Sequence, residues 1–264
     1  MQNLNYGVIG NCSTAALISE KGAIEWLCFP EFDSPSVFAA ILDRQKGGHF
    51  GFKVTSDYKV TQSYVPHTNI LSTHFESEEG AFDVVDFMPC YPTSDGKDFY
   101  RPAEIYRYIR WAKGRPRMKV DYRPAPNYAR GKTIYNVTSQ YVETYSSVEN
   151  KDRQYLYSSL DLKKVVNHDE ITLEKDEFFL FSFNEKVIPV DIEREKLEYC
   201  RTLVYWLNWT DHAKRYTRYN EVIERSMLVL KLMTYRNGAV MADHQSAGDC
   251  RGGEKLGLPF LLAA

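Results

Sequence analysis

Cysteine and histidine are scarce in this 264-residue sequence, and neither follows a pattern that would assign it a class. The five cysteines are odd in number and form no Cys-x-x-Cys pair, so we expect free thiols in a reducing cytoplasm. The six histidines lack the spacing of metal ligands. We therefore expect no disulfide framework, no metal site and no metal cofactor.

Long basic runs and long apolar runs are also missing. The net charge of −2 argues against nucleic acid as the main partner. No window is apolar over the length that spans a bilayer, so we expect no membrane partner. The segment Met1–Tyr6 lacks the basic and apolar regions of a signal peptide, which again favours the cytoplasm. No phosphate-binding loop or Gly-x-Ser-x-Gly motif indicates a nucleotide cofactor or a serine hydrolase.

Aromatic residues, in contrast, are abundant, at 14% of the sequence with 19 tyrosines. Tyrosine suits half-buried strands, and its ring and hydroxyl also suit sugar binding, so composition leaves both interpretations open. Short apolar or alternating segments recur between turns of hairpin length, which predicts a mainly β fold of two stacked antiparallel sheets. The predicted strands cover residues 6–9, 14–19, 23–29, 49–54, 58–64, 69–76, 81–88, 104–113, 118–123, 133–137, 140–145, 154–159, 170–173 and 177–183.

The segment Gly22–Asp43 combines several signals. The apolar run Ala23–Phe29 predicts a buried strand that ends before Pro30. Ser34 and Pro35 then predict the N-cap and first position of a short helix, with an apolar face formed by Val37, Phe38, Ile41 and Leu42.

The loop between this strand and this helix carries two aromatic rings and two carboxylates, a composition that suits sugar contact. The candidate substrate-binding residues are Trp26, Phe29, Phe32 and Asp33. The alternative, a strand-to-helix corner that is simply packed by aromatic side chains, stays open.

Two helices are predicted after the last strand. Asp191 can cap the first, and Asn237-Gly238 marks the end of the second. Their apolar faces are Leu197, Cys200, Val204 and Leu207 in the first helix, and Tyr219, Val222, Ile223, Ser226, Leu230 and Met233 in the second. Such helices need a surface to pack on. We divide the chain into a β domain (1–188), a helical linker (189–240) and an atypical tail (241–264).

Several motifs resemble the N-terminal domain of glycoside hydrolase family 15, which contains bacterial glucoamylase-like enzymes and trehalases. They are Tyr6–Ser19, the residues Gly22, Ile24 and Trp26–Cys28, the segment Phe32–Phe38, Val85–Pro89, Arg123-Pro124 with Tyr128, and the helical segment Tyr205–Tyr235. The resemblance covers roughly residues 5–242. It implies an antiparallel β super-sandwich followed by linker helices that lead to an (α/α)6 barrel.

In that family the barrel carries out hydrolysis with inversion, using one glutamate as general acid and one as general base. Two such carboxyls lie about 6.5–9.5 Å apart, which leaves room for the attacking water. The resemblance implies an α-glucan or trehalose as the substrate of the full-length parent, and the chain's own barrel as its packing partner. This chain contains almost none of that barrel, so no catalytic residue is assigned to it.

The tail departs from the family pattern. Relatives continue with Thr-Thr-Ser-Leu-Pro-Glu and then Arg-Asn-Trp-Asp-Tyr-Arg, whereas this chain has Asp243–Ala264. A forward shift of one base lets the codons of Asp243–Gly248 and of Glu254–Ala264 encode both motifs in order. We therefore expect a frameshift near Ala242-Asp243, with residues 243–264 translated out of frame; the nucleotide sequence tests this.

Three functions stay open at this point. The chain is a fragment of an α-glucan or trehalose hydrolase that is inactive by itself, a β-sandwich that binds carbohydrate without cleaving it, or a scaffold that packs against a barrel or another subunit. Calorimetry with maltose, maltotriose and trehalose tests the second function. The third predicts an exposed apolar stripe on the helices between residues 191 and 235.

Overall fold

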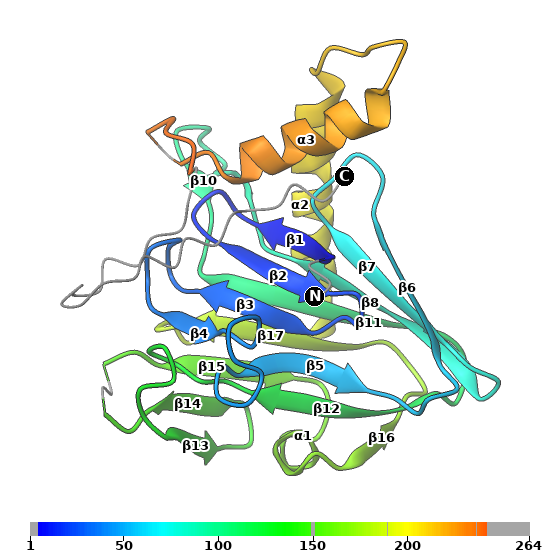
Figure 1. The fold of residues 1–264 in the computed structure, drawn as a ribbon, viewed down its shortest axis with the longest axis vertical. Coiled ribbons are helices and arrows are strands. Elements are labelled where there is room, and N and C mark those ends of the chain that lie inside the picture. The colour runs from blue at the N-terminus through cyan, green and yellow to red at the C-terminus, as the bar shows by residue number, and fades with distance from the viewer. Residues whose placement is uncertain (1–4, 149–150, 189, 236, 242–264) are drawn as a thin grey trace.

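The computed structural model describes residues 5–148, 151–188, 190–235 and 237–241. Two antiparallel sheets face each other, and two long helices pack against one of them (Figure 1). The predicted fold class, a mainly β sandwich followed by two helices, is confirmed. The division into a β domain, a linker and a tail stays a prediction, and the atypical tail from residue 242 onward lies outside the described residues.

The seven-stranded sheet contains the beginning of the chain. Its order is β1-β2-β3-β5-β12-β16, with β4 paired to β3. Gly22 lies in the turn between β2 and β3 with φ 74°, a conformation that glycine adopts without strain. The strands are β1 (Tyr6–Gly10), β2 (Ala15–Ser19), β3 (Ile24–Cys28), β4 (Ser36–Phe38), β5 (His49–Lys53), β12 (Arg117–Arg123) and β16 (Glu170–Thr172).

The eight-stranded sheet has the order β13-β14-β15-β17-β11-β8-β7-β6. The predicted hairpin at Ser77–Gly80 is confirmed, because the Ser77 amide donates to the Gly80 carbonyl at 2.9 Å. The strands are β6 (Lys59–Tyr64), β7 (Leu71–Glu76), β8 (Gly80–Phe87), β11 (Glu104–Gly114), β13 (Thr133–Val137), β14 (Val142–Ser146), β15 (Gln154–Ser158) and β17 (Glu177–Phe183). A separate ribbon pairs β9 (Tyr91–Pro92) with β10 (Phe99–Tyr100).

The core between the sheets is built mainly from phenylalanine rings. Phe50 of one sheet meets Phe179 of the other edge to face, with ring centres 5.4 Å apart, and Phe38 meets Phe181 at 5.5 Å. Full burial of one such side chain contributes about 1.5–3 kcal/mol. Arg107 is also fully buried there, with its guanidinium 4.7 Å from the ring centres of Phe50 and Phe52.

The outer side of the eight-stranded sheet is covered by α2 (Ile192–Asp211) and α3 (Asn220–Leu232). In Figure 1, α2 runs behind this sheet and α3 crosses its upper end. The predicted N-cap is confirmed, since the Asp191 carboxylate accepts a hydrogen bond from the Arg194 amide at 2.8 Å. A second apolar cluster joins Trp206 and Leu232 of the helices to Phe87 and Tyr106 of the sheet.

Hydrogen bonds fix α3 to segments from the first third of the chain. The Cys12 thiol donates to the Lys231 carbonyl at 3.4 Å, and the Asn69 amide donates to the Leu228 carbonyl at 3.0 Å. Arg225 donates to the Thr68 carbonyl at 2.9 Å. The end of the helical segment therefore rests on the β1–β2 and β6–β7 connections.

The sheet does not cover the apolar face expected for α2. Cys200 is exposed, and the exposed fractions are 48% for Leu197, 63% for Val204 and 39% for Leu207. Tyr205 and Trp206 pack inward instead, because two large rings bury more apolar area than the aliphatic side chains would. On α3 the inward residues are Leu228 and Leu232, whereas Tyr219, Val222 and Leu230 of the expected face are at least half exposed. Both helices therefore expose apolar side chains.

The short helix expected from Ser34 through Leu42 is wrong. Residues 36–38 form β4, in which Phe38 pairs with Leu27, and a turn follows. The Ser34 hydroxyl accepts a hydrogen bond from the Glu31 amide at 3.0 Å instead of capping a helix. Val37 and Phe38 are β-branched and aromatic and are almost fully buried in the core, so strand packing outweighs the weak local helix signal.

One short helix was not expected. α1 (Leu162–Asn167) begins at Asp161, whose carboxylate accepts from the Lys163 amide at 2.9 Å. Val165 is fully buried and joins the core between the sheets. Six residues are too few to show a helical period in the sequence.

Candidate functional site

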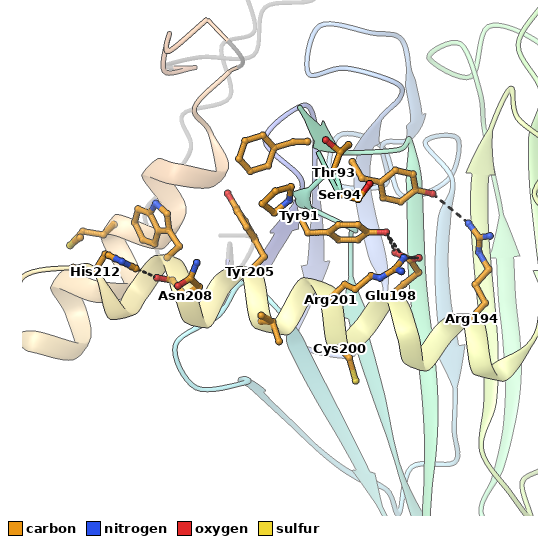
Figure 2. Close-up of a pocket in the computed structure, with 17 residues that line it drawn as sticks. Tyr91, Thr93, Ser94, Arg194, Glu198, Cys200, Arg201, Tyr205, Asn208 and His212 are labelled. Atoms are coloured by element: carbon orange, nitrogen blue, oxygen red, sulfur yellow. Dashed lines mark hydrogen bonds and ion pairs between the residues drawn. The ribbon is translucent and has the colours of Figure 1, made fainter. Parts of the chain in front are cut away.

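A groove lies between the β9–β10 ribbon and α2 (Figure 2). Its volume is about 1240 Å³. The ribbon follows directly from β8, and its connecting loop is closed by the Thr93 amide, which donates to the Asp98 carbonyl at 2.8 Å. The groove is thus held by a strand ribbon on one side and a twenty-residue helix on the other.

Tyr91, Glu198 and Arg201 form a polar network at the groove wall (Figure 2). The Tyr91 hydroxyl donates to Glu198 Oε2 at 2.7 Å, and Arg201 Nη1 donates to the same hydroxyl at 3.3 Å. Arg201 also lies 3.5 Å from Glu198 Oε1. Burial and the hydrogen bond to Glu198 raise the pKa of Tyr91, so this hydroxyl stays protonated and keeps donating.

A second network surrounds Arg194, one helical turn before Glu198. Arg194 Nη2 donates to the Tyr100 hydroxyl at 3.4 Å, and Nε donates to the Tyr106 hydroxyl at 3.2 Å. Glu104 balances this charge, with an oxygen 3.9 Å from Arg194 Nη2. Burial and the Glu104 carboxylate raise the pKa of Tyr100 to about 12.

The remaining wall is aromatic and amide-bearing. Phe99 meets Tyr205 edge to face with ring centres 5.9 Å apart, and Trp209 lies one turn further along α2. Asn208 and His212 follow on the same side of the helix (Figure 2). The His212 Nδ1 lies 2.6 Å from the Asn208 carbonyl. A carbonyl can only accept, so Nδ1 carries a proton, and Nε2 is the ring nitrogen left for another partner.

This arrangement is suited to binding rather than hydrolysis. Glu198 is the one carboxylate among the described residues that line the groove, and it is occupied by Tyr91 and Arg201. Hydrolysis of a glycosidic bond by two carboxyls needs a second acid at a distance of about 5–10 Å across the bond. Within the described part of the chain, this groove supplies no such pair.

The four residues predicted to contact substrate lie elsewhere. Phe29 is fully buried in the core between the sheets and stacks on Phe181 at 5.9 Å. Trp26 is 8% exposed and belongs to a small apolar cluster on the outer side of the seven-stranded sheet. Phe32 belongs to the cluster under the helices. Asp33 is exposed. The structure does not bring these side chains together at the groove, and their role in sugar contact stays a prediction.

The groove residues were missed because the ribbon and α2 are about a hundred positions apart in the sequence. One signal was available on the helix itself. Arg194, Glu198, Arg201, Tyr205, Asn208 and His212 recur every three or four residues and so share one side of a helix. The spacing identifies a polar and aromatic stripe, although it cannot show which segment lies opposite.

The antiparallel sandwich with two covering helices defines the class of this β domain. Comparison with known families then identifies it: residues 5–150, more than half of the chain, match the family described as trehalase-like, N-terminal. The chain belongs to this family. The resemblance to the N-terminal domain of trehalase-like glycoside hydrolases is thereby confirmed.

Individual relatives extend the match through the helices. The trehalase of Thermoplasma acidophilum is 29% identical over 250 residues, which cover 90% of this chain and 42% of the relative. The trehalase of Mycolicibacterium smegmatis is 26% identical over 269 residues, 90% of this chain and 39% of the relative. Trehalase 1 of Sulfolobus acidocaldarius is 51% identical over 85 residues, 31% of this chain and 14% of the relative. The chain spans about two fifths of the length of the first two relatives.

No helix among the described residues is long and apolar enough to cross a membrane.

Proposed function

We propose that this chain is the N-terminal β domain and helical linker of an inverting glycoside hydrolase that acts on α-glucosidic bonds, with trehalose or an α-glucan as the substrate of the full-length parent. The observation that carries the proposal is the match to proteins named trehalase over 90% of this chain, including the helices. The chain by itself is not hydrolytic, because the groove offers a single carboxylate.

The second part of the proposal is that α2 and α3 form the platform for a catalytic barrel. Their outward apolar side chains support it: Leu197, Val204 and Leu207 on α2, and Val222 and Leu230 on α3, are between 39% and 63% exposed. A row of exposed aliphatic side chains on neighbouring helices is typical of a surface that another domain covers. Asp33, the one exposed residue of the four candidate substrate-binding residues, is proposed to reach that barrel's rim.

The frameshift is a proposal of the same kind. It concerns residues 243–264, which lie outside the described residues, and it rests on the two family motifs that appear when the reading frame is shifted by one base. Sequencing of the coding region through and beyond the Ala264 codon tests it. A downstream frame that encodes no (α/α)6 barrel overturns the frameshift and leaves the platform role open to the next test.

A chimera tests the platform role. Residues 1–241 replace the corresponding N-terminal part of the Thermoplasma acidophilum trehalase, and glucose release from trehalose and maltose is measured for the chimera and for this chain alone. We expect hydrolysis only in the chimera, with nuclear magnetic resonance showing inverted configuration of the first product.

Matched variants make the test specific. Leu197→Glu places a charge on the proposed platform and is expected to lower the chimera's activity at least tenfold, whereas Lys196→Glu, also exposed on α2, leaves it unchanged. Glucose release by this chain alone overturns its proposed inactivity. Equal activity of the Leu197→Glu chimera and its parent overturns the platform.

A further inference from the structure

The groove between the β9–β10 ribbon and α2 is not explained by a platform role. We propose that it is a non-catalytic binding site for a neutral saccharide of two or more pyranose rings. This inference goes beyond the proposed function, because it assigns a ligand site to the β domain and its helix rather than to a barrel.

The size of the groove favours a ligand of several rings. The groove encloses about 1240 Å³, whereas pockets for single small ligands measure about 300–1,000 Å³. It is open along α2 from Arg194 to His212, and these two residues are five helical turns apart (Figure 2). An elongated ligand of linked rings suits this shape better than a compact one.

The groove also has an aromatic surface that a ligand can reach. Tyr100, Phe99 and Trp209 line the groove, and each is half-buried, so each ring keeps some surface that a ligand can reach. Trp209 enters no ring–ring or cation–ring contact with another described residue. A ring face of this kind packs against the C–H bonds of a pyranose, and the hydroxyls then point to the groove walls.

The charges in the groove favour a neutral ligand. The groove contains two guanidiniums, but Arg201 lies 3.5 Å from Glu198 and Arg194 lies 3.9 Å from Glu104. Each cation is therefore balanced by a carboxylate, and neither is left over to hold an anion. A phosphate or a carboxylate would have to compete with these partners, whereas a neutral polyol can accept from the outer guanidinium N–H groups without displacing them.

The groove also offers side chains that can hydrogen-bond to a ligand. The side chains of Ser94 and Asn208 line the groove and make no hydrogen bond to another described residue. His212 leaves Nε2 for a ligand, because its Nδ1–H is directed at the Asn208 carbonyl. Hydroxyl, amide and imidazole groups beside aromatic rings are the set that recognises sugar hydroxyls, each of which both donates and accepts.

Calorimetric titration of the full chain tests the proposal with maltotriose, trehalose and, as the anion, sulfate. We expect saturable binding of at least one saccharide, quenching or a shift of tryptophan emission on binding, and no heat with sulfate. Absence of saccharide binding at millimolar concentrations overturns the proposal, as does binding of sulfate with the same or higher affinity.

Three variants locate the site. Trp209→Ala is expected to weaken saccharide binding at least about tenfold and to abolish the emission change. Asn208→Ala, at an exposed position that folding does not require, is expected to weaken binding about two- to tenfold. The control is Trp111→Ala on β11, which is 37% exposed and lies outside the groove; it should bind as the parent does. Unchanged affinity in both groove variants places any binding elsewhere and overturns the proposal.

This test and the chimera test fail separately. Loss of saccharide binding in the chain leaves hydrolysis by the chimera untouched, and an inactive chimera says nothing about binding by the chain.

Discussion

Arg107 Nε donates to Asp86 Oδ1 at 2.7 Å, and both side chains are fully buried. The same guanidinium donates to the Phe50 carbonyl at 2.5 Å and to the Gly22 carbonyl. Asp86 and Arg107 belong to the eight-stranded sheet, Phe50 belongs to the other sheet, and Gly22 lies in the turn between β2 and β3 of that other sheet. One ion pair therefore joins the two sheets through hydrogen bonds inside an aromatic core.

Replacement of this arginine is expected to be severe. Arg107→Met leaves the Asp86 carboxylate and two carbonyls buried without their donor, so we expect a loss of about 3–5 kcal/mol in the free energy of unfolding. The control is Arg110→Met on the same strand. The Arg110 side chain is 54% exposed, so its pair with Asp83 contributes about 0–1 kcal/mol. Urea denaturation followed by circular dichroism measures both losses. Equal losses would contradict the role of the Arg107–Asp86 pair in joining the two sheets.

Glu195 gives the protein a specific pH dependence. Burial, reinforced by Asp86, Glu198 and Glu104 and opposed by Arg194, raises its pKa well above the ordinary value. The folded state then holds a proton that the unfolded state releases, so stability falls as the pH rises from about 4.5 toward the raised pKa.

Glu195→Gln removes this penalty. Relative to the parent, we expect the variant to be equally stable near pH 4 and progressively more stable toward pH 7, by about 1.4 kcal/mol for each pH unit crossed. Urea titrations at several pH values measure the difference. Glu193→Gln, at an exposed position of the same helix, should show no such trend; a flat difference for Glu195→Gln contradicts the prediction.

Two glycines with similar backbones separate strain from crowding. Gly114 has φ 70° and a Cβ there would lie 2.3 Å from the Glu79 carbonyl oxygen, whereas Gly96 has φ 66° and nothing within 4 Å. We expect Gly96→Ala to cost about 1–2 kcal/mol, from conformation alone. Gly114→Ala should cost clearly more, because the β8–β11 pairing has to shift. Thermal denaturation of both variants tests this, and similar melting temperatures would contradict it.

The cap of α2 is testable by a conservative pair. Asp191→Ala removes the acceptor for the Arg194 amide and is expected to destabilise the protein by about 0.5–2 kcal/mol. Asp191→Asn retains a side-chain oxygen and should lose only a small part of that. Urea denaturation compares the two, and equal losses would show that charge rather than capping matters there.

The orientation of α2 is tested by two neighbouring residues. Val204→Ser, at a position 63% exposed, is expected to change the free energy of unfolding by less than about 0.5 kcal/mol. Trp206→Ala, at a position 1% exposed, should cost about 3–5 kcal/mol. Denaturation of this chain measures both, and the reverse order would mean that the aliphatic face packs on the sheet.

The sandwich was predictable because strand signals are local. Alternation and turn residues gave strands such as 133–137 and 177–183 with the bounds that the structure shows. The prediction of a helix over residues 34–42 was wrong, because its capping signal is local, whereas the burial of Phe38 depends on strands far away in the sequence.

The functional groove was less predictable for a related reason. Periodicity shows that α2 has an aliphatic face and a polar, aromatic one, but not which of them the sheet covers. Leu197 and Val204 look like core residues in the sequence and are exposed in the structure. Tyr91 and Glu198 meet only because the β9–β10 ribbon folds over the helix.

The contacts that fix α3 also bear on how the chain is made. The Cys12 thiol donates to the carbonyl of Lys231, which lies 219 positions later in the chain. At a synthesis rate of about 5–20 residues per second, that partner leaves the ribosome about 10–45 s after Cys12 does. Until α2 and α3 are made, Ile70 and Phe87, which belong to the cluster under these helices, have no helix over them. A nascent chain of this kind is a natural client for a holding chaperone, and expression yield should depend on one.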